Sequence, residues 1–236
     1  MTRQDHRIPR AQRAVAICTA LGLGLLAGTG AQAATTPHRS AAFEMGATTG
    51  FGARADVTLH DITRDLPLSL RLGVGYAGRD AGDPLAARRV FINNNTNGTP
   101  DESGHSWQLR LDLVRPVARL GQAPVNLGVG VRKAYFTGTF DYIGGNENFD
   151  VTCRPWGLGF ALDTAFAVGQ STSLTFAAGL DRYFGATMEG HDTAYSPDGT
   201  AINAQDDYAW ADADDAINQP RWELTAVMGL RWHLGR

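Results

Sequence analysis

Apolar and polar residues alternate along the end of the chain. Every second residue from Trp222 to Leu234 is apolar, and the residues between them are mostly polar or small. A period of two residues predicts one extended strand with an apolar and a mixed face. Typical soluble strands have only about five or six residues, whereas about 9–11 are needed to cross a bilayer. The pattern therefore predicts a membrane-spanning strand with a tryptophan near each end of its apolar face.

The same alternation recurs in seven earlier segments. These segments are residues 41–49, 54–62, 68–76, 107–114, 125–132, 156–168 and 174–181. Together with the last strand they predict an all-β fold, a closed antiparallel up-and-down transmembrane β-barrel of eight strands. An even meander of this kind can close on itself and leave no sheet edge exposed in lipid.

The predicted connections alternate in length. Those near 64–67, 119–124 and 169–172 are short, and those at 79–104, 144–153 and 188–218 are long and polar or irregular. Short turns on one side and long loops on the other are typical of outer-membrane barrels, in which the long loops are extracellular. The short gap near 50–53 is the exception.

Aromatic residues mark the strand ends next to the long connections. Each of the six lies on the apolar phase of its strand; they are Tyr76, Trp107, Tyr135, Trp156, Phe184 and Trp222. On an eight-strand meander they lie at one height. This pattern predicts an aromatic girdle at the outer interface.

The N-terminus has the features of a secretory signal peptide. Four arginines precede the apolar run 14–27, and Ala31-Gln32-Ala33 forms an A-x-A cleavage signal. We expect residues 1–33 to be cleaved, 34–40 to be a polar lead-in and 41–236 to form the barrel. An uncleaved helical anchor is the alternative. Cleavage would remove four of the 21 basic and one of the 24 acidic residues, which leaves a charge of −6 and argues against nucleic-acid binding.

These features together resemble the small eight-stranded outer-membrane barrels of the outer membrane protein A and X type. The resemblance covers residues 40–236, and GHDTAYSPDG with DADDAINQP is also similar to an uncharacterised set of bacterial barrels. It implies the outer membrane of a Gram-negative bacterium, with outer-membrane lipid, lipopolysaccharide and the barrel assembly machinery as partners. The chain departs from the usual terminal aromatic residue, because HLGR follows Trp232.

The inward phase of the predicted barrel consists largely of glycine, alanine and charged residues. Besides Glu44, the inward charges are Arg71, Arg110, Asp112, Arg132, Asp163, Asp181, Glu223 and Arg231. Unpaired charges in a narrow lumen are costly, so we expect a plug of salt bridges, with Arg132 between Asp112 and Asp163. A gate or proton-linked site is the alternative.

Candidate chemistry elsewhere is sparse. Histidine with a nearby serine occurs at His105-Ser106 and at His191 with Asp192 and Ser196, but no G-x-S-x-G or H-E-x-x-H motif is present. The acidic residues that could offer oxygen ligands to calcium are Asp206, Asp207, Asp212, Asp214 and Asp215. They lack EF-hand spacing, so we expect a solvated acidic loop, no metal and no cofactor.

We therefore expect a non-enzymatic outer-membrane barrel. It would present segments 79–104 and 188–218 for surface interaction or envelope integrity. A barrel enzyme acting on lipid A, phospholipid or peptide is one alternative, which a Ser or Thr hydroxyl within about 3.2 Å of a His at the outer leaflet would favour. A soluble lipocalin-like binder is another, and it would turn its apolar phase inward.

Overall fold

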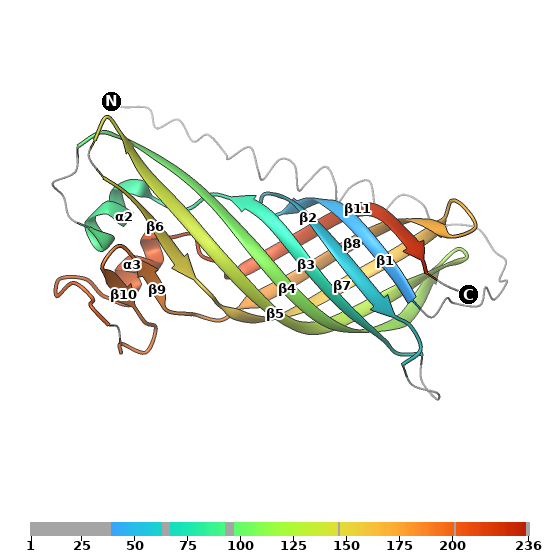
Figure 1. Ribbon diagram of the computed structural model, residues 1–236. Coiled ribbons are helices and arrows are strands. Elements are labelled where there is room, and N and C mark those ends of the chain that lie inside the picture. Colours follow the sequence, from blue (N-terminus) through green and yellow to red (C-terminus); the bar gives the residue numbers. More distant parts are fainter. Residues whose placement is uncertain (1–38, 63–66, 93–96, 146, 201, 235–236) are drawn as a thin grey trace, which may run out of the picture.

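Eight strands close into a barrel. The computed structural model describes residues 39–62, 67–92, 97–145, 147–200 and 202–234, so the predicted signal peptide lies outside the described residues. The ring runs β1–β2–β3–β4–β5–β7–β8–β11, with β11 pairing back to β1, and each of these pairs is antiparallel (Figure 1). The predicted fold class is confirmed.

The barrel strands differ in length. They are β1 (Arg39–Thr48), β2 (Phe51–Leu59), β3 (Ser69–Arg79), β4 (Thr99–Leu120), β5 (Ala123–Ile143), β7 (Trp156–Ala167), β8 (Thr172–Tyr183) and β11 (Trp222–His233). The first two begin earlier than predicted, and β2 does so because Thr49 and Gly50 alone make the turn, with Thr49 at a φ of 64°.

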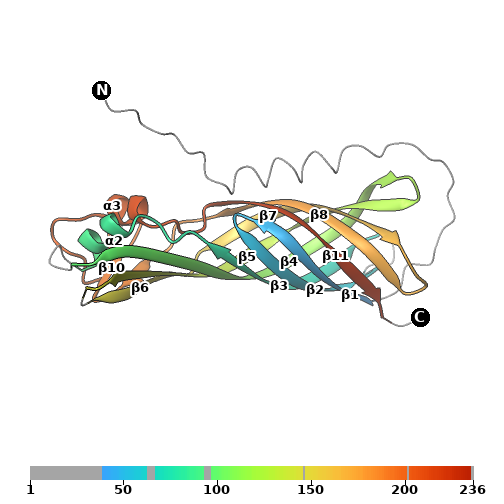
Figure 2. The same cartoon turned by 90° about the horizontal axis from the view of Figure 1, so that it is seen from above.

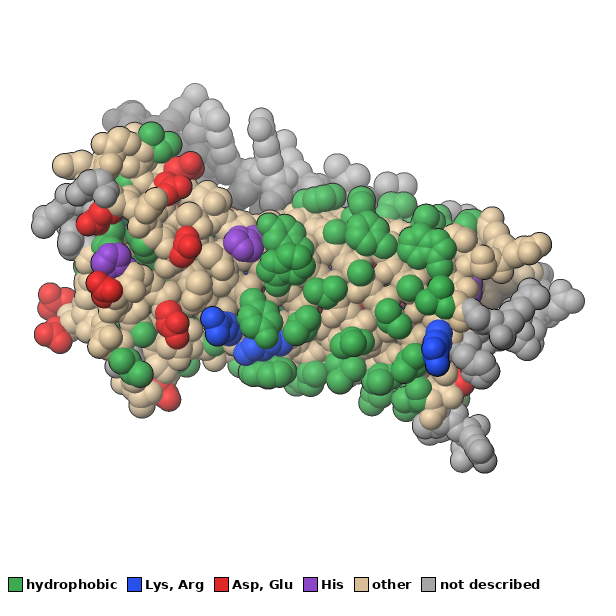
Figure 3. Space-filling model, viewed as in Figure 1, with side chains coloured by type: hydrophobic (Ala, Val, Ile, Leu, Met, Phe, Trp, Pro, Cys, Tyr) green, Lys and Arg blue, Asp and Glu red, His purple; other side chains and the backbone are tan. Residues whose placement is uncertain are grey.

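The apolar phase faces outward. Leu111, Phe160 and Leu224 have exposed fractions of 42%, 56% and 60%, whereas Arg132 and Asp163 have 1% and 2%. Hydrophobic side chains are spread over the barrel part of the visible face, and we call this region the belt (Figure 3). A soluble barrel has the opposite arrangement, so the lipocalin-like alternative is wrong.

The two ends of the barrel are unequal. At one end, here called the short-turn end, β4–β5 and β7–β8 are joined by tight turns. At the other end, β4 and β5 continue beyond the barrel as a long ribbon joined by α2 (Pro84–Phe91), β6 (Asn148–Cys153), β9 (Met188–Gly190), β10 (Thr193–Tyr195) and α3 (Trp210–Ala216). We call this unit the extension; both helices lie in it in Figures 1 and 2. Neither helix is long and apolar enough to cross a membrane.

The extension corrects the prediction that segments 79–104, 144–153 and 188–218 are loops. It has its own apolar core, in which Phe91, Phe136, Phe140, Met188 and Tyr195 are at most 1% exposed. The α2 helix begins at Pro84, and the Asp83 carboxylate accepts hydrogen bonds from two backbone N–H groups of its first turn. The polar start of β4 is a strand because its backbone pairs with β5.

Candidate functional site

The lumen of the barrel holds a network of buried ion pairs. At its centre, Arg132 on β5 donates to Asp112 on β4 (2.5 Å) and to Asp181 on β8 (2.8 Å). Asp112 also accepts from Arg110 at 2.9 Å. The expected partnership of Arg132 with Asp163 is therefore wrong, because Asp181 takes that place.

Asp163 instead forms a second cluster. Its carboxylate accepts from Arg71 at 2.5 Å, from Arg231 at 3.2 Å and from the Asn126 amide at 3.1 Å. Arginines from β3 and β11 thus meet one aspartate from β7 across the lumen. The side chain of Asp163 is fully buried, and such a group is tolerable only when it is paired.

Several lumen residues were not predicted. Arg54 and Asp56 on β2 join Glu44 and Arg110, with Arg54 2.5 Å from Glu44 and 3.4 Å from Asp56. The sequence pattern could have identified both residues, because they alternate with the apolar Val57 in the predicted strand 54–62 and so lie on its inward face.

Glu223, which was predicted to lie in the lumen, also has unpredicted partners. Its carboxylate accepts from Arg79 at 2.6 Å and from the Gln108 amide. The sequence pattern predicts that Arg79 begins a loop, whereas it ends β3 and points inward.

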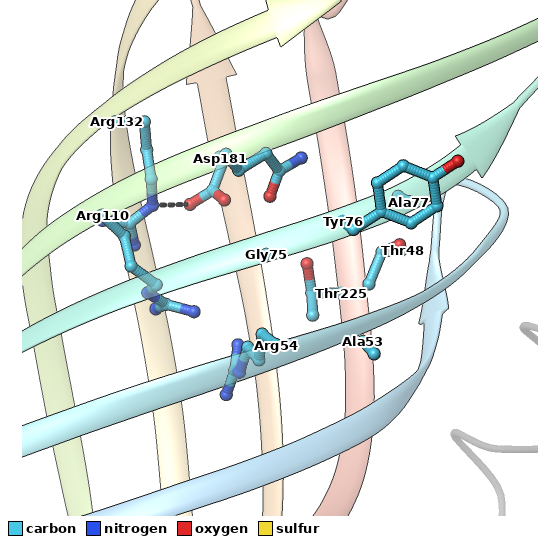
Figure 4. Close-up of a pocket in the computed structure, with 11 residues that line it drawn as sticks. Thr48, Ala53, Arg54, Gly75, Tyr76, Ala77, Arg110, Arg132, Asp181 and Thr225 are labelled. Atoms are coloured by element: carbon cyan, nitrogen blue, oxygen red, sulfur yellow. Dashed lines mark hydrogen bonds and ion pairs between the residues drawn. The ribbon is translucent and has the colours of Figure 1, made fainter.

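Glycines make room for the arginines. A Cβ at Gly159 would lie 2.3 Å from the Arg132 guanidinium, and one at Gly73 would lie 2.8 Å from the Arg110 side chain. The arginines lie across these positions, and a cavity in the lumen beside Arg54, Arg110 and Asp181 has a volume of about 20 Å³ (Figure 4). A single water needs about 10–15 Å³, so this space admits little more than one.

The six girdle aromatics lie outside the barrel, next to the extension. Their exposed fractions lie between 41% and 60%. Tyr76 pairs in register with Trp107, which pairs in register with Tyr135. The backbone N–H of Phe184 donates to the Trp156 carbonyl, which continues the row toward β8.

Two serine–histidine pairs lie at the short-turn end. Ser40 Oγ is 2.9 Å from His60 Nε2, and Ser173 Oγ is 3.0 Å from His233 Nε2. Burial and the nearby Arg231 lower the pKa of His60 to about 4. The pairs are at the opposite end from the girdle, so they do not meet the geometric criterion that would favour an outer-leaflet enzyme.

The histidines expected to lie near the exterior have other neighbours. The His105 ring stacks on Tyr76 with a centroid distance of 5.8 Å, and His191 Nδ1 is 3.3 Å from Asp192. Ser106 is fully buried. Among the described residues, neither His105 nor His191 forms a hydrogen bond with a serine or threonine hydroxyl.

The acidic run does not converge on one point. Asp212 caps the backbone N–H of Ala209, and Asp214 contacts Gln219 and Arg221. Asp206, Asp207 and Asp215 are exposed. Across the part of the chain that the structure describes, no three His, Cys, Asp or Glu side chains gather as metal ligands.

Cys153 on β6 provides a probe of the extension. It is 2% exposed, and burial raises the pKa of its thiol to about 12. Because the thiolate is the reactive form, we expect folded protein to react with a maleimide at pH 8 at least about 100-fold more slowly than denatured protein. An exposed cysteine, Ile202→Cys in a Cys153→Ala background, is the control and should react equally in both states. Equal rates for Cys153 would contradict the packing described here.

Comparison with known proteins identifies the fold. No protein-family profile and no curated protein matches the sequence. The structure is similar to that of a major outer membrane protein from Thermus thermophilus, with a TM-score of 0.66, 26% identity, and coverage of 82% of this chain and 97% of that chain. The chain has the fold of an outer-membrane β-barrel protein. Acinetobacter baumannii CarO matches more weakly, with a TM-score of 0.39, 11% identity, and coverage of 84% and 98%.

For this outer-membrane barrel, the belt and girdle correspond to the apolar band and aromatic rings that such proteins turn toward lipid. The narrower resemblance to the outer membrane protein A and X type stays a prediction.

Proposed function

We propose that the protein is a non-enzymatic outer-membrane barrel with a closed lumen that presents its folded extension at the cell surface. The observation that carries the proposal is the lumen network, in which the side chains of Arg132, Asp112 and Asp163 are at most 1% exposed. Eight-stranded barrels are just wide enough for side chains to fill. A lumen filled in this way is structural, and interaction is left to the outer surface.

The extension supplies that surface. Its apolar core keeps α2, α3 and the ends of β4 and β5 together, and acidic side chains gather over it on the face shown in Figure 3. An ordered unit of this kind suits surface interaction or envelope integrity. In this proposal the barrel assembly machinery inserts the chain, and the belt contacts outer-membrane lipid.

Ion conductance tests the closed lumen. We expect the refolded protein to give no channel openings in a planar lipid bilayer, because buried arginine–carboxylate pairs cross the lumen of a barrel that side chains can fill. Arg132→Ala, selected as folded by its heat-modifiable gel mobility, should admit small cations by removing the central guanidinium. Steady conductance by the unaltered protein would overturn the proposal. An unchanged lipid mass profile in cells with and without the protein would support the absence of lipid-modifying activity.

A further inference from the structure

Three cations lie on the outer surface of the barrel where the belt meets the extension. They are Lys133 on β5, Arg154 between β6 and β7, and Arg182 on β8. Among the described residues none of the three forms an ion pair with a carboxylate. The nearby Arg221, in contrast, is paired with Asp214. The neighbouring extension is rich in acidic residues, yet among the described residues none of them pairs with these three cations.

Girdle tryptophans hold two of these cations in place. The Lys133 ammonium lies 4.7 Å from the centre of the Trp156 ring, and the Arg182 guanidinium lies 5.1 Å from that of Trp222. Such contacts are attractive because the ring face is negative. Lys133 Nζ also donates to the Arg154 carbonyl at 2.5 Å, which fixes Arg154 next to it.

The strand register brings the cations to both sides of β7. Lys133 pairs with Trp156 from the β5 side, and Arg182 pairs with Leu158 from the β8 side. Neighbouring strands are about 4.8 Å apart, and Trp156 and Leu158 are two residues apart along β7, so the two backbone positions are separated by roughly 12 Å. Lysine and arginine side chains are long, so both charged ends can reach a lipid headgroup that lies over β7.

A groove opens beside Arg154. It has a volume of about 210 Å³ and is lined by Thr152, Cys153, Arg154, Ala186, Thr187 and Glu189. Two hydroxyls and a guanidinium are suitable donors to phosphate oxygens. Glu189 is the one acidic lining residue, and it leaves the excess positive charge of Lys133, Arg154 and Arg182 in place.

The apolar outer surface of the barrel begins next to the cations, on the side away from the extension. Leu158, Phe160 and Leu162 follow Trp156 along the outer face of β7 and are at least half exposed. On the neighbouring strands β3 and β4, the girdle level has Tyr76, His105 and Trp107 but no outward Lys or Arg among the described residues. On the face shown in Figure 3, the Lys and Arg side chains lie at the two edges of the belt.

We propose that Lys133, Arg154 and Arg182 bind the phosphate of a lipid headgroup in the outer leaflet, with its acyl chains against Leu158 and Phe160. The adjacent apolar strip favours a lipid over a free anion. The site rests on the proposed membrane placement, but it is independent of whether the lumen conducts ions.

Native mass spectrometry of the refolded protein in detergent micelles tests this site. Phosphatidic acid and phosphatidylcholine with the same acyl chains are the probes, with and without excess inorganic phosphate. Each cation near a charged surface contributes about fivefold in affinity, so Lys133→Gln with Arg154→Gln and Arg182→Gln should lower phosphatidic acid retention on the order of a hundredfold. Retention by the unaltered protein should persist in inorganic phosphate.

A matched variant controls for total charge. Arg39→Gln with Arg115→Gln and Arg119→Gln removes three exposed cations at the short-turn end and should leave retention unchanged. Equal losses in both triple variants, no loss in the first, or full competition by inorganic phosphate would each overturn the proposal. Arg154→Gln alone, expected to lose about fivefold, provides the test if the triple variant does not fold. Conductance is measured separately, so failure of this site and failure of the closed lumen are distinguishable.

Discussion

Asp163→Asn is expected to lower the free energy of unfolding by about 3–5 kcal/mol, because breaking a buried ion pair strands the remaining charge. Asp163 is the carboxylate shared by Arg71 and Arg231, at 2.5 and 3.2 Å. Arginine cannot lose its proton in a protein. The substitution therefore leaves two guanidiniums facing each other in the lumen, where neither can be neutralised.

Urea titration of the refolded protein in lipid vesicles, followed by heat-modifiable gel mobility, measures this loss. Asp150→Asn is the matched control, since Asp150 is exposed on β6 and accepts a hydrogen bond from Thr139. Exposed substitutions usually change stability by less than about 0.5 kcal/mol. If the two variants shift the midpoint equally, the Asp163 cluster does not stabilise the barrel.

The lumen also shows what the sequence can and cannot predict. Period-two alternation assigns Arg132, Asp112 and Asp181 to the inward phase, because phase depends only on neighbours along the strand. Which inward side chains contact each other depends on how far neighbouring strands are offset along the barrel. It also depends on the length of the arginine side chain. Counting residues from the short turns predicts that Arg132 and Asp163 lie at the same height in the barrel. In the structure the long Arg132 side chain reaches Asp181 on β8 instead.

The extension was missed for a different reason. Its core is built from a few residues of each of several short segments, such as Phe91 on α2, Phe149 on β6 and Tyr195 on β10. The Phe91 and Tyr195 rings pack edge to face with centroids 5.6 Å apart. Only β5 carries a period-two apolar face into the extension, and the other described segments are too short to give a period. The tertiary packing of these residues is therefore what reveals the unit.

Phe140→Ala is expected to destabilise the extension by about 3–5 kcal/mol, the usual cost of removing a buried phenylalanine ring. Phe140 is fully buried, and its ring stacks on Phe149 with centroids 5.3 Å apart. The core meets the lumen network where Arg79 lies over the Phe136 ring, and Phe140 packs farther along β5, so the extension should open while the barrel stays folded. Limited proteolysis should then cleave the extension much faster, with the heat-modifiable mobility of the barrel retained.

Leu85→Ala tests whether that effect is specific to the core. Leu85 lies on α2 in the same unit but is 45% exposed, so its truncation should change the cleavage rate little. If Phe140→Ala instead abolished the heat-modifiable mobility, the barrel and the extension would unfold as one cooperative unit. Independent opening is what the structure favours, because β4 and β5 join the extension to a barrel whose own ring of strand pairing is already complete.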